Sequence, residues 1–142
     1  MATFNKYNIF VQDLASGVHT FGSDTLKVAL TNTTPNATDE ILTDIGQITA
    51  GSGYTAGGNT ATTTSALQTA GVFRLVLADP PSWTGDGAGM EAFQYAVLYN
   101  DTPADPVDPL IGYWDYGASV GLNSGDVFTV DFNPTSGVLT IQ

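Results

Sequence analysis

Three apolar, aromatic runs fill the C-terminal third of the chain: FQYAVLYND at residues 93–101, LIGYWDYG at 110–117 and DVFTVDFNPTSGVLTIQ at 126–142. Apolar side chains in residues 93–99 fall on both faces of an extended chain, which indicates a strand that is covered on both sides. Clusters of Asn, Asp, Pro and Gly between the runs favour turns. The last run predicts a hairpin of Val127–Phe132 with Val138–Ile141 across the sequence NPTSG.

Further strands are expected before these runs. Apolar residues alternate with other residues in Asp24–Asn32, which predicts a half-buried strand. Residues 71–79 predict a buried strand, and the Thr-rich residues 60–64 predict an edge strand. Closely spaced strands without helices between them are typical of a sandwich. We therefore expect a single all-β domain spanning residues 1–142, in which residues 23–142 build an antiparallel β-sandwich of about seven or eight strands.

A single helix is expected near the N-terminus. Over residues 5–19 the apolar side chains recur with the period of an amphipathic helix. They are Tyr7, Phe10, Val11, Leu14 and Val18. Asn5 is expected to cap this helix, and Gly17 or Gly22 to end it. Residues 1–22 thus predict an N-terminal helical segment, which either covers an open face of the sheet or docks on a neighbouring subunit.

The chain is strongly acidic. It has 14 Asp and Glu residues against three cations, Lys6, Lys27 and Arg74, which gives a net charge of -11. Such a surface repels phosphate, so neither a nucleic acid nor an anionic membrane is expected as a partner. The absence of cysteine excludes disulfides and thiolate-bound metals. The first residues lack the charged start and apolar block of a signal peptide, and no apolar run approaches the ~18 residues of a membrane span.

No constellation of reactive residues is evident. His19 is the single imidazole, and no G-x-S-x-G nucleophile motif accompanies it. Asp101, Asp105 and Asp108 could offer oxygen ligands to Ca²⁺, but their spacing matches no EF-hand, and solvated loop acids are the simpler interpretation. Asp115, set between two aromatic residues, leaves glycan cleavage as a further hypothesis, since glycosidases use carboxylates. We expect no enzymatic activity, no cofactor and no bound metal.

The aromatic residues have two interpretations. Trp83, Tyr113 and Trp114 form a candidate ligand surface, because exposed rings can stack on a sugar. Alternation along Leu110–Tyr116 places Ile111 and Tyr113 on one face and Trp114 on the other. The alternative is that these rings form cross-strand pairs in the core of a sheet.

Six blocks of the sequence are informative beyond their strand patterns: Ser23–Asn32, Gly53–Thr60, Leu75–Asp79, Tyr95–Thr102, Leu110–Gly117 and Gly125–Phe132. Together they resemble a family of small structural proteins encoded by tailed bacteriophages. The resemblance implies a capsid decoration (cement) protein on the virion surface, bound to the major capsid protein and to itself as a homo-oligomer, with a trimer as the expected form. The alternative is a tail or fibre component with a β-sandwich that binds host-surface glycans. The family has no catalytic residues to transfer.

Two regions are candidates for docking under the decoration hypothesis, because neither is clearly committed to the core. One is the N-terminal segment through Val18, and the other is the Gly- and Thr-rich loop Ala50–Ser65. The candidate docking residues are Phe4, Tyr7, Phe10, Val11, Leu14 and Tyr54.

Overall fold

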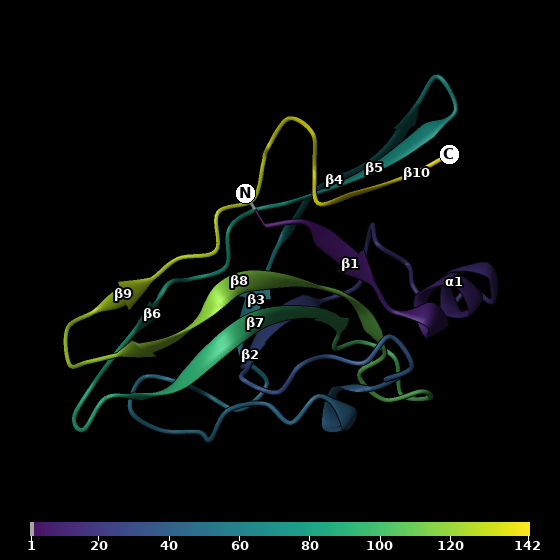
Figure 1. Cartoon of the computed structure of the whole chain (residues 1–142). Helices are drawn as coiled ribbons and strands as arrows, with labels where there is room; N and C mark the ends of the chain where they lie inside the picture. Colours follow the sequence, from purple (N-terminus) through teal and green to yellow (C-terminus); the bar gives the residue numbers. More distant parts are fainter. Residues whose placement is uncertain (1) are drawn as a thin grey trace.

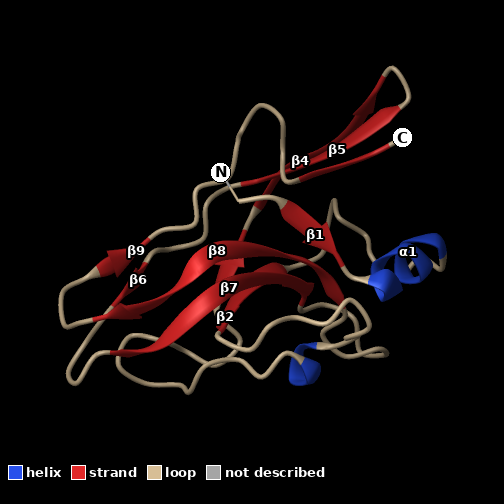
Figure 2. Cartoon of the chain, viewed as in Figure 1, coloured by secondary structure: helices blue, strands red, loops and turns tan. Residues whose placement is uncertain are grey.

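A computed structural model describes residues 2–142 and shows an all-β fold with one N-terminal α-helix (Figures 1 and 2). The strands are β1 (Phe4–Lys6), β2 (Leu26–Thr31), β3 (Asn59–Ala61), β4 (Thr63–Thr69), β5 (Val72–Leu77), β6 (Trp83–Thr84), β7 (Met90–Asn100), β8 (Leu110–Leu122), β9 (Val127–Phe128) and β10 (Leu139–Ile141). The helices are α1 (Asn8–Ala15) and a short 3₁₀ helix, η1 (Leu42–Asp44). None of the helices in residues 2–142 has the length and apolar character needed to cross a membrane.

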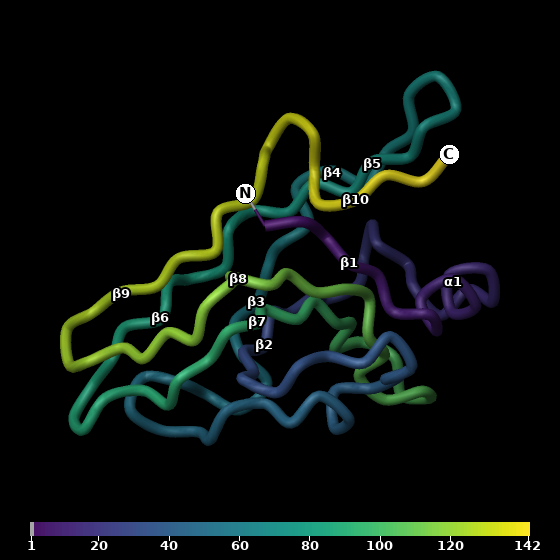
Figure 3. The backbone as a smooth tube through the Cα atoms, viewed as in Figure 1, coloured from purple at the N-terminus to yellow at the C-terminus, as the bar shows by residue number. Residues whose placement is uncertain are grey.

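The strands form three antiparallel sheets. The largest has the order β1-β8-β7-β2-β3, the second has the order β10-β5-β4, and the third pairs β6 with β9. β7 and β8 are 11 and 13 residues long, and they form the central hairpin of the largest sheet. The backbone trace in Figure 3 shows this hairpin crossing the body of the molecule, while the β4–β5 hairpin projects away from it.

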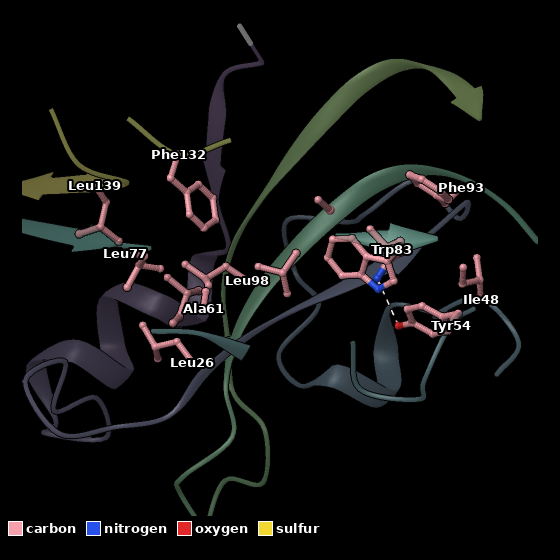
Figure 4. Close-up of a cluster of buried hydrophobic side chains, with 14 of the residues drawn as sticks. Leu26, Ile48, Tyr54, Ala61, Leu77, Trp83, Phe93, Leu98, Phe132 and Leu139 are labelled. Atoms are coloured by element: carbon pink, nitrogen blue, oxygen red, sulfur yellow. Dashed lines mark hydrogen bonds between the residues drawn. The ribbon is translucent and has the colours of Figure 1, made fainter. Parts of the chain in front are cut away.

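The main core lies between the five-stranded sheet and the two smaller sheets. It combines Leu26 and Leu98 from the large sheet, Leu77 and Leu139 from the three-stranded sheet, and Trp83 from β6. All five side chains are buried, and Figure 4 shows the leucines together in one part of the cluster and Trp83 in another. Apolar faces of facing sheets are thus buried against each other, which is the arrangement of a sandwich.

The opposite face of the large sheet is covered as well. Val97 of β7 and Leu110 of β8 pack there with Leu42 and Ile45, which belong to the segment around η1. The buried Thr31 hydroxyl attaches this segment to β2 by donating to the Ile45 carbonyl at 3.0 Å. Both faces of β7 are therefore buried, as its apolar pattern predicts.

A bulge near the start of β8 determines which residues share a face. The β7–β8 register shifts between Leu98 and Tyr99, which leaves Ile111 as an extra residue in β8. As a result Ile111 belongs to the main core, whereas Tyr113 packs on the opposite face. The prediction that these two residues share a face is wrong, because alternation holds only where a strand has no extra residue.

The N-terminal segment is less helical than predicted. Residues 4–6 pair with β8, so Asn5 lies in a strand and Tyr7 occupies the N-cap position of α1. Gly17 follows the helix with a φ of 76°, a left-handed conformation that is common just after a helix end. Residues 1–22 are therefore not a purely helical segment, since β1 belongs to the five-stranded sheet.

The predicted C-terminal hairpin does not form. β9 pairs with β6 through Phe128 and Trp83, and β10 pairs with β5. Between these strands Phe132 enters the main core, and its amide donates to the Asp79 carboxylate at 2.7 Å. β9 and β10 thus pair with strands that are distant in the sequence. Alternation of apolar residues predicts that a strand forms, but it does not determine the partner of that strand.

A two-residue turn, Ala70-Gly71, closes the β4–β5 hairpin. Its φ angles are 52° and 82°, and a type I′ turn requires positive values at both positions. Alanine pays a steric cost of roughly 1–2 kcal/mol in this conformation, whereas Asn-Gly is the preferred sequence.

We therefore expect Ala70→Asn to raise the free energy of unfolding by about 0.5–1 kcal/mol, measured by urea denaturation. Ala56→Asn is the control, because Ala56 is also exposed but does not have a positive φ. Equal stability of the two variants would contradict a turn-specific effect.

Candidate functional site

A groove of about 340 Å³ opens between the β7–β8 hairpin and the chain that follows β9. Its walls are largely aromatic, with contributions from β1, β7, β8 and residues 128–132. The aromatic lining residues are Phe4, Phe93, Tyr95, Trp114, Tyr116, Phe128 and Phe132. This aromatic groove, defined by those residues, is larger than the hollow of about 210 Å³ that Leu14, His19 and Phe21 line.

Strand pairing places the rings of the aromatic groove. Phe4 lies directly opposite Trp114 across the β1–β8 ladder, with ring centroids 5.3 Å apart. The Phe132 ring also packs against Trp114, with a centroid distance of 5.4 Å. Tyr116 packs edge-on against Phe128 at 5.8 Å and is 60% exposed. The groove therefore has a packed floor and an open aromatic rim.

Polar groups at the groove are few, and most are already bonded. The Gln94 side-chain amide donates to Asp115 at 2.9 Å, and the Gly117 amide donates to the same carboxylate oxygen at 2.7 Å. Asn133 accepts hydrogen bonds from two backbone amides of its own turn. Asp131 is the single charged residue among the described lining residues. Glycoside hydrolysis commonly uses a pair of carboxylates, and the groove does not assemble one.

The structure separates the three residues of the predicted ligand surface. Trp114 is half-buried and lines the aromatic groove. Trp83 is only 1% exposed and belongs to the main core, where Figure 4 shows it in the same part of the cluster as Tyr54 and Phe93. Tyr113 lies on the other face of the sheet, with its ring 5.3 Å from that of Tyr7. A surface that joins all three residues does not exist, because burial and the β8 bulge divide them.

The predicted docking residues are also divided. Tyr7, Phe10 and Tyr54 are 0%, 5% and 3% exposed, so they stabilise the core and offer no surface to a partner. Tyr54 shows this clearly: its hydroxyl accepts from the Leu30 amide and donates to Gln47, and burial raises its pKa to about 12.

The other three predicted docking residues have accessible surface. Val11 is 54% exposed on α1, and Leu14 is half-buried beside Phe21 and Phe73. Phe4 is half-buried and lines the aromatic groove. Of the six candidates, only Phe4 therefore contributes to the groove.

His19 has a structural environment. Its ring lies 5.5 Å from the ring of Phe21, with an angle of 6° between the two planes, and it also contacts Phe10. The Asn100 side-chain amide donates to His19 Nδ1 at 3.1 Å and to Asp24 at 2.6 Å. Burial lowers the pKa of His19 to about 4, although the nearby Asp24 carboxylate opposes this shift. His19 is thus a neutral, packed imidazole at neutral pH.

The acidic loop after β7 is tied to the sheet by a cation. Lys27 forms an ion pair with Asp101 at 2.9 Å. Burial raises the pKa of Asp108, and the neighbouring Asp101 raises it further. Within residues 2–142 no group of three His, Asp or Glu side chains is arranged to hold a metal ion.

No family model matches this sequence, and no match was found among curated proteins or among solved structures.

Sequence reasoning missed part of the aromatic groove. Phe128 and Phe132 are visible in the run VFTVDF, but a local hairpin was expected there. Their place in the groove depends on the pairing of β9 with β6 and of β10 with β5. The one sequence signal for this groove is the high density of aromatic residues in residues 110–117 and 126–132. That signal does not separate a ligand surface from a core, because both are rich in aromatic residues.

Proposed function

We propose that this chain is a non-enzymatic structural protein of a tailed-phage virion that decorates and stabilises the exterior of the capsid. The aromatic groove carries the proposal, because it offers apolar binding surface without a set of reactive groups. The sequence resemblance to small phage structural proteins supports the same function. The partners in this proposal are the major capsid protein and further copies of the chain.

Aromatic side chains in a preformed groove suit a stable attachment. Such residues commonly dominate the binding energy at protein interfaces, provided that water is excluded from them. The groove contains no basic residue and one acid, Asp131, on a chain of net charge -11. A neutral or basic surface of the capsid protein would complement it, whereas packaged DNA would repel it.

Imaging and quantifying the chain in virions tests the location. Hundreds of copies on the head would support the decoration function. A few copies at the tail tip would contradict it.

Trp114→Ala should weaken attachment to purified capsid shells that lack the protein by at least about tenfold, because central aromatic residues of an interface typically contribute more than 1 kcal/mol. Co-sedimentation of variant and shells measures this. Val127→Ala is the control, since Val127 is 60% exposed and does not line the groove. Equal loss in both variants, or none in Trp114→Ala, would place the attachment elsewhere.

A tail or fibre component that binds host glycans is the second candidate. The observation that favours it is that the rings of Trp114 and Tyr116 lie in one groove with the polar side chains of Gln94 and Asn133. Rings with adjacent hydrogen-bonding groups are typical of small-ligand sites. If the protein binds glycans on an array and Tyr116→Ala abolishes this binding, the result would favour this function. Absence of binding to any glycan on the array would contradict it.

A further inference from the structure

The β4 strand presents a long unpaired edge in the described part of the molecule. β4 is the outer strand of the order β10-β5-β4 and is 7 residues long. The other strands at sheet edges, β1, β3 and β10, are 3 residues long, and β6 and β9 are 2. A long free edge presents a row of backbone donors and acceptors to any extended chain that approaches it.

The sequence of β4 does not protect this edge. Natural proteins commonly block edge strands with charged residues, proline or bulges, but β4 reads TTSALQT. Its one register irregularity lies at the start, between Thr63 and Ser65. Leu67, in the regular part, is 70% exposed, the highest value among the large apolar residues. Figure 1 shows the closed end of the hairpin projecting clear of the other elements.

The charge distribution indicates what covers the edge. Residues 45–78 contain no Asp or Glu, and their only charge is Arg74, whereas the rest of the chain carries all 14 acids. Two copies with a net charge of -11 each repel one another over most of their surfaces. The β4–β5 hairpin lies within the longest stretch of the sequence without Asp or Glu, so two copies that pair along β4 do not bring carboxylates of these strands together. This favours a second copy of the chain over an unrelated partner.

We propose that β4 pairs antiparallel with β4 of a second copy across a two-fold axis at Leu67, which joins two three-stranded sheets into one of six strands. The same patch then serves both copies, as two-fold interfaces require. Leu67 lies opposite Arg74, and Arg74 lies opposite Thr140. In the dimer, Leu67 of the second copy would extend this row of cross-strand neighbours. Neighbouring strands are about 4.8 Å apart, which separates the two Arg74 side-chain positions by about 14 Å. That exceeds the screening length of about 8 Å at physiological salt.

This inference does not depend on where the protein lies in a virion. It differs from the trimer that the family resemblance implies, because a two-fold contact produces dimers. Measurements on the purified full chain therefore test it separately from the capsid experiments.

The first experiment measures mass against concentration by analytical ultracentrifugation. We expect a monomer–dimer equilibrium that tightens as salt screens the acidic repulsion. Leu67→Lys should weaken dimerisation at least tenfold by placing a charge at the centre of the edge pairing. Val127→Lys, at a position 60% exposed, should leave it unchanged. A monomer up to millimolar concentration, a trimer, or a dimer that persists in Leu67→Lys would overturn the proposal.

The second experiment uses the absence of natural cysteine. Directly opposed residues of an antiparallel pair have Cα atoms about 4.5–5.5 Å apart, within the range of a disulfide. Leu67→Cys should therefore form a disulfide-linked dimer rapidly under mild oxidation. Thr140→Cys, exposed on β10, would lie about five strand spacings, or roughly 24 Å, from its counterpart, and should not. Equal cross-linking of the two variants would rule out pairing at Leu67.

Discussion

Replacing Trp83 with alanine should lower the free energy of unfolding by about 3–5 kcal/mol, the usual cost of removing a buried tryptophan. Trp83 is 1% exposed and packs against Phe128, which ties β6 to β9. Its loss leaves a cavity between the large sheet and the two-stranded sheet. Urea denaturation followed by circular dichroism measures the change.

Tyr116→Ala is the matched control for this experiment. Tyr116 contacts the same Phe128 ring, at 5.8 Å compared with 6.2 Å for Trp83, but it is 60% exposed. We expect a loss of less than about 1 kcal/mol, as is usual for exposed positions. Similar losses in the two variants would contradict the placement of Trp83 in the core.

The protein should lose stability in mild acid because of His19. Its pKa is about 4 in the folded chain, below the ordinary value of 6.5. As the pH falls below 6.5, the unfolded chain binds a proton that the folded chain does not, so unfolding becomes more favourable until about pH 4. The full effect is about 3 kcal/mol, since each pKa unit corresponds to about 1.4 kcal/mol. Urea titrations at several pH values measure it.

His19→Phe isolates this contribution from that of the carboxylates. The variant keeps a ring beside Phe10 and Phe21 but cannot bind a proton. Its loss of the bond from Asn100 lowers stability about equally at every pH. The difference in unfolding free energy between wild type and variant should therefore change between pH 6.5 and 4. A constant difference would mean that His19 titrates alike in both states.

Much of the fold could be predicted because several strands carry a complete local pattern. The alternation in residues 24–32, 71–79 and 93–99 corresponds to β2, β5 and β7. The apolar side chains on both faces of β7 were expected to be buried, and each face packs in one of two hydrophobic clusters. Residues 60–64, predicted as an edge strand, fall in β3 and β4, and both lie at sheet edges.

The remaining differences arise where pairing depends on distant segments. The C-terminal runs have the pattern of a hairpin, but β9 pairs with β6 and β10 pairs with β5 instead. The first residues have a helical period, yet β8 pairs with residues 4–6 because its edge is free there. For the same reason the aromatic groove was only partly predictable: Trp114 and Phe4 were candidates, whereas Phe128 and Phe132 reach it through long-range pairing.

The two terminal strands determine how the molecule would respond to mechanical tension. β1 and β10 are 3 residues each, and they lie at the edges of different sheets. A force pulling these strands apart would act on only a few backbone hydrogen bonds at each end. The β2, β7 and β8 strands, paired in the middle of the large sheet, would be loaded later. Under load the edges should therefore peel away first, and the central hairpin should rupture last.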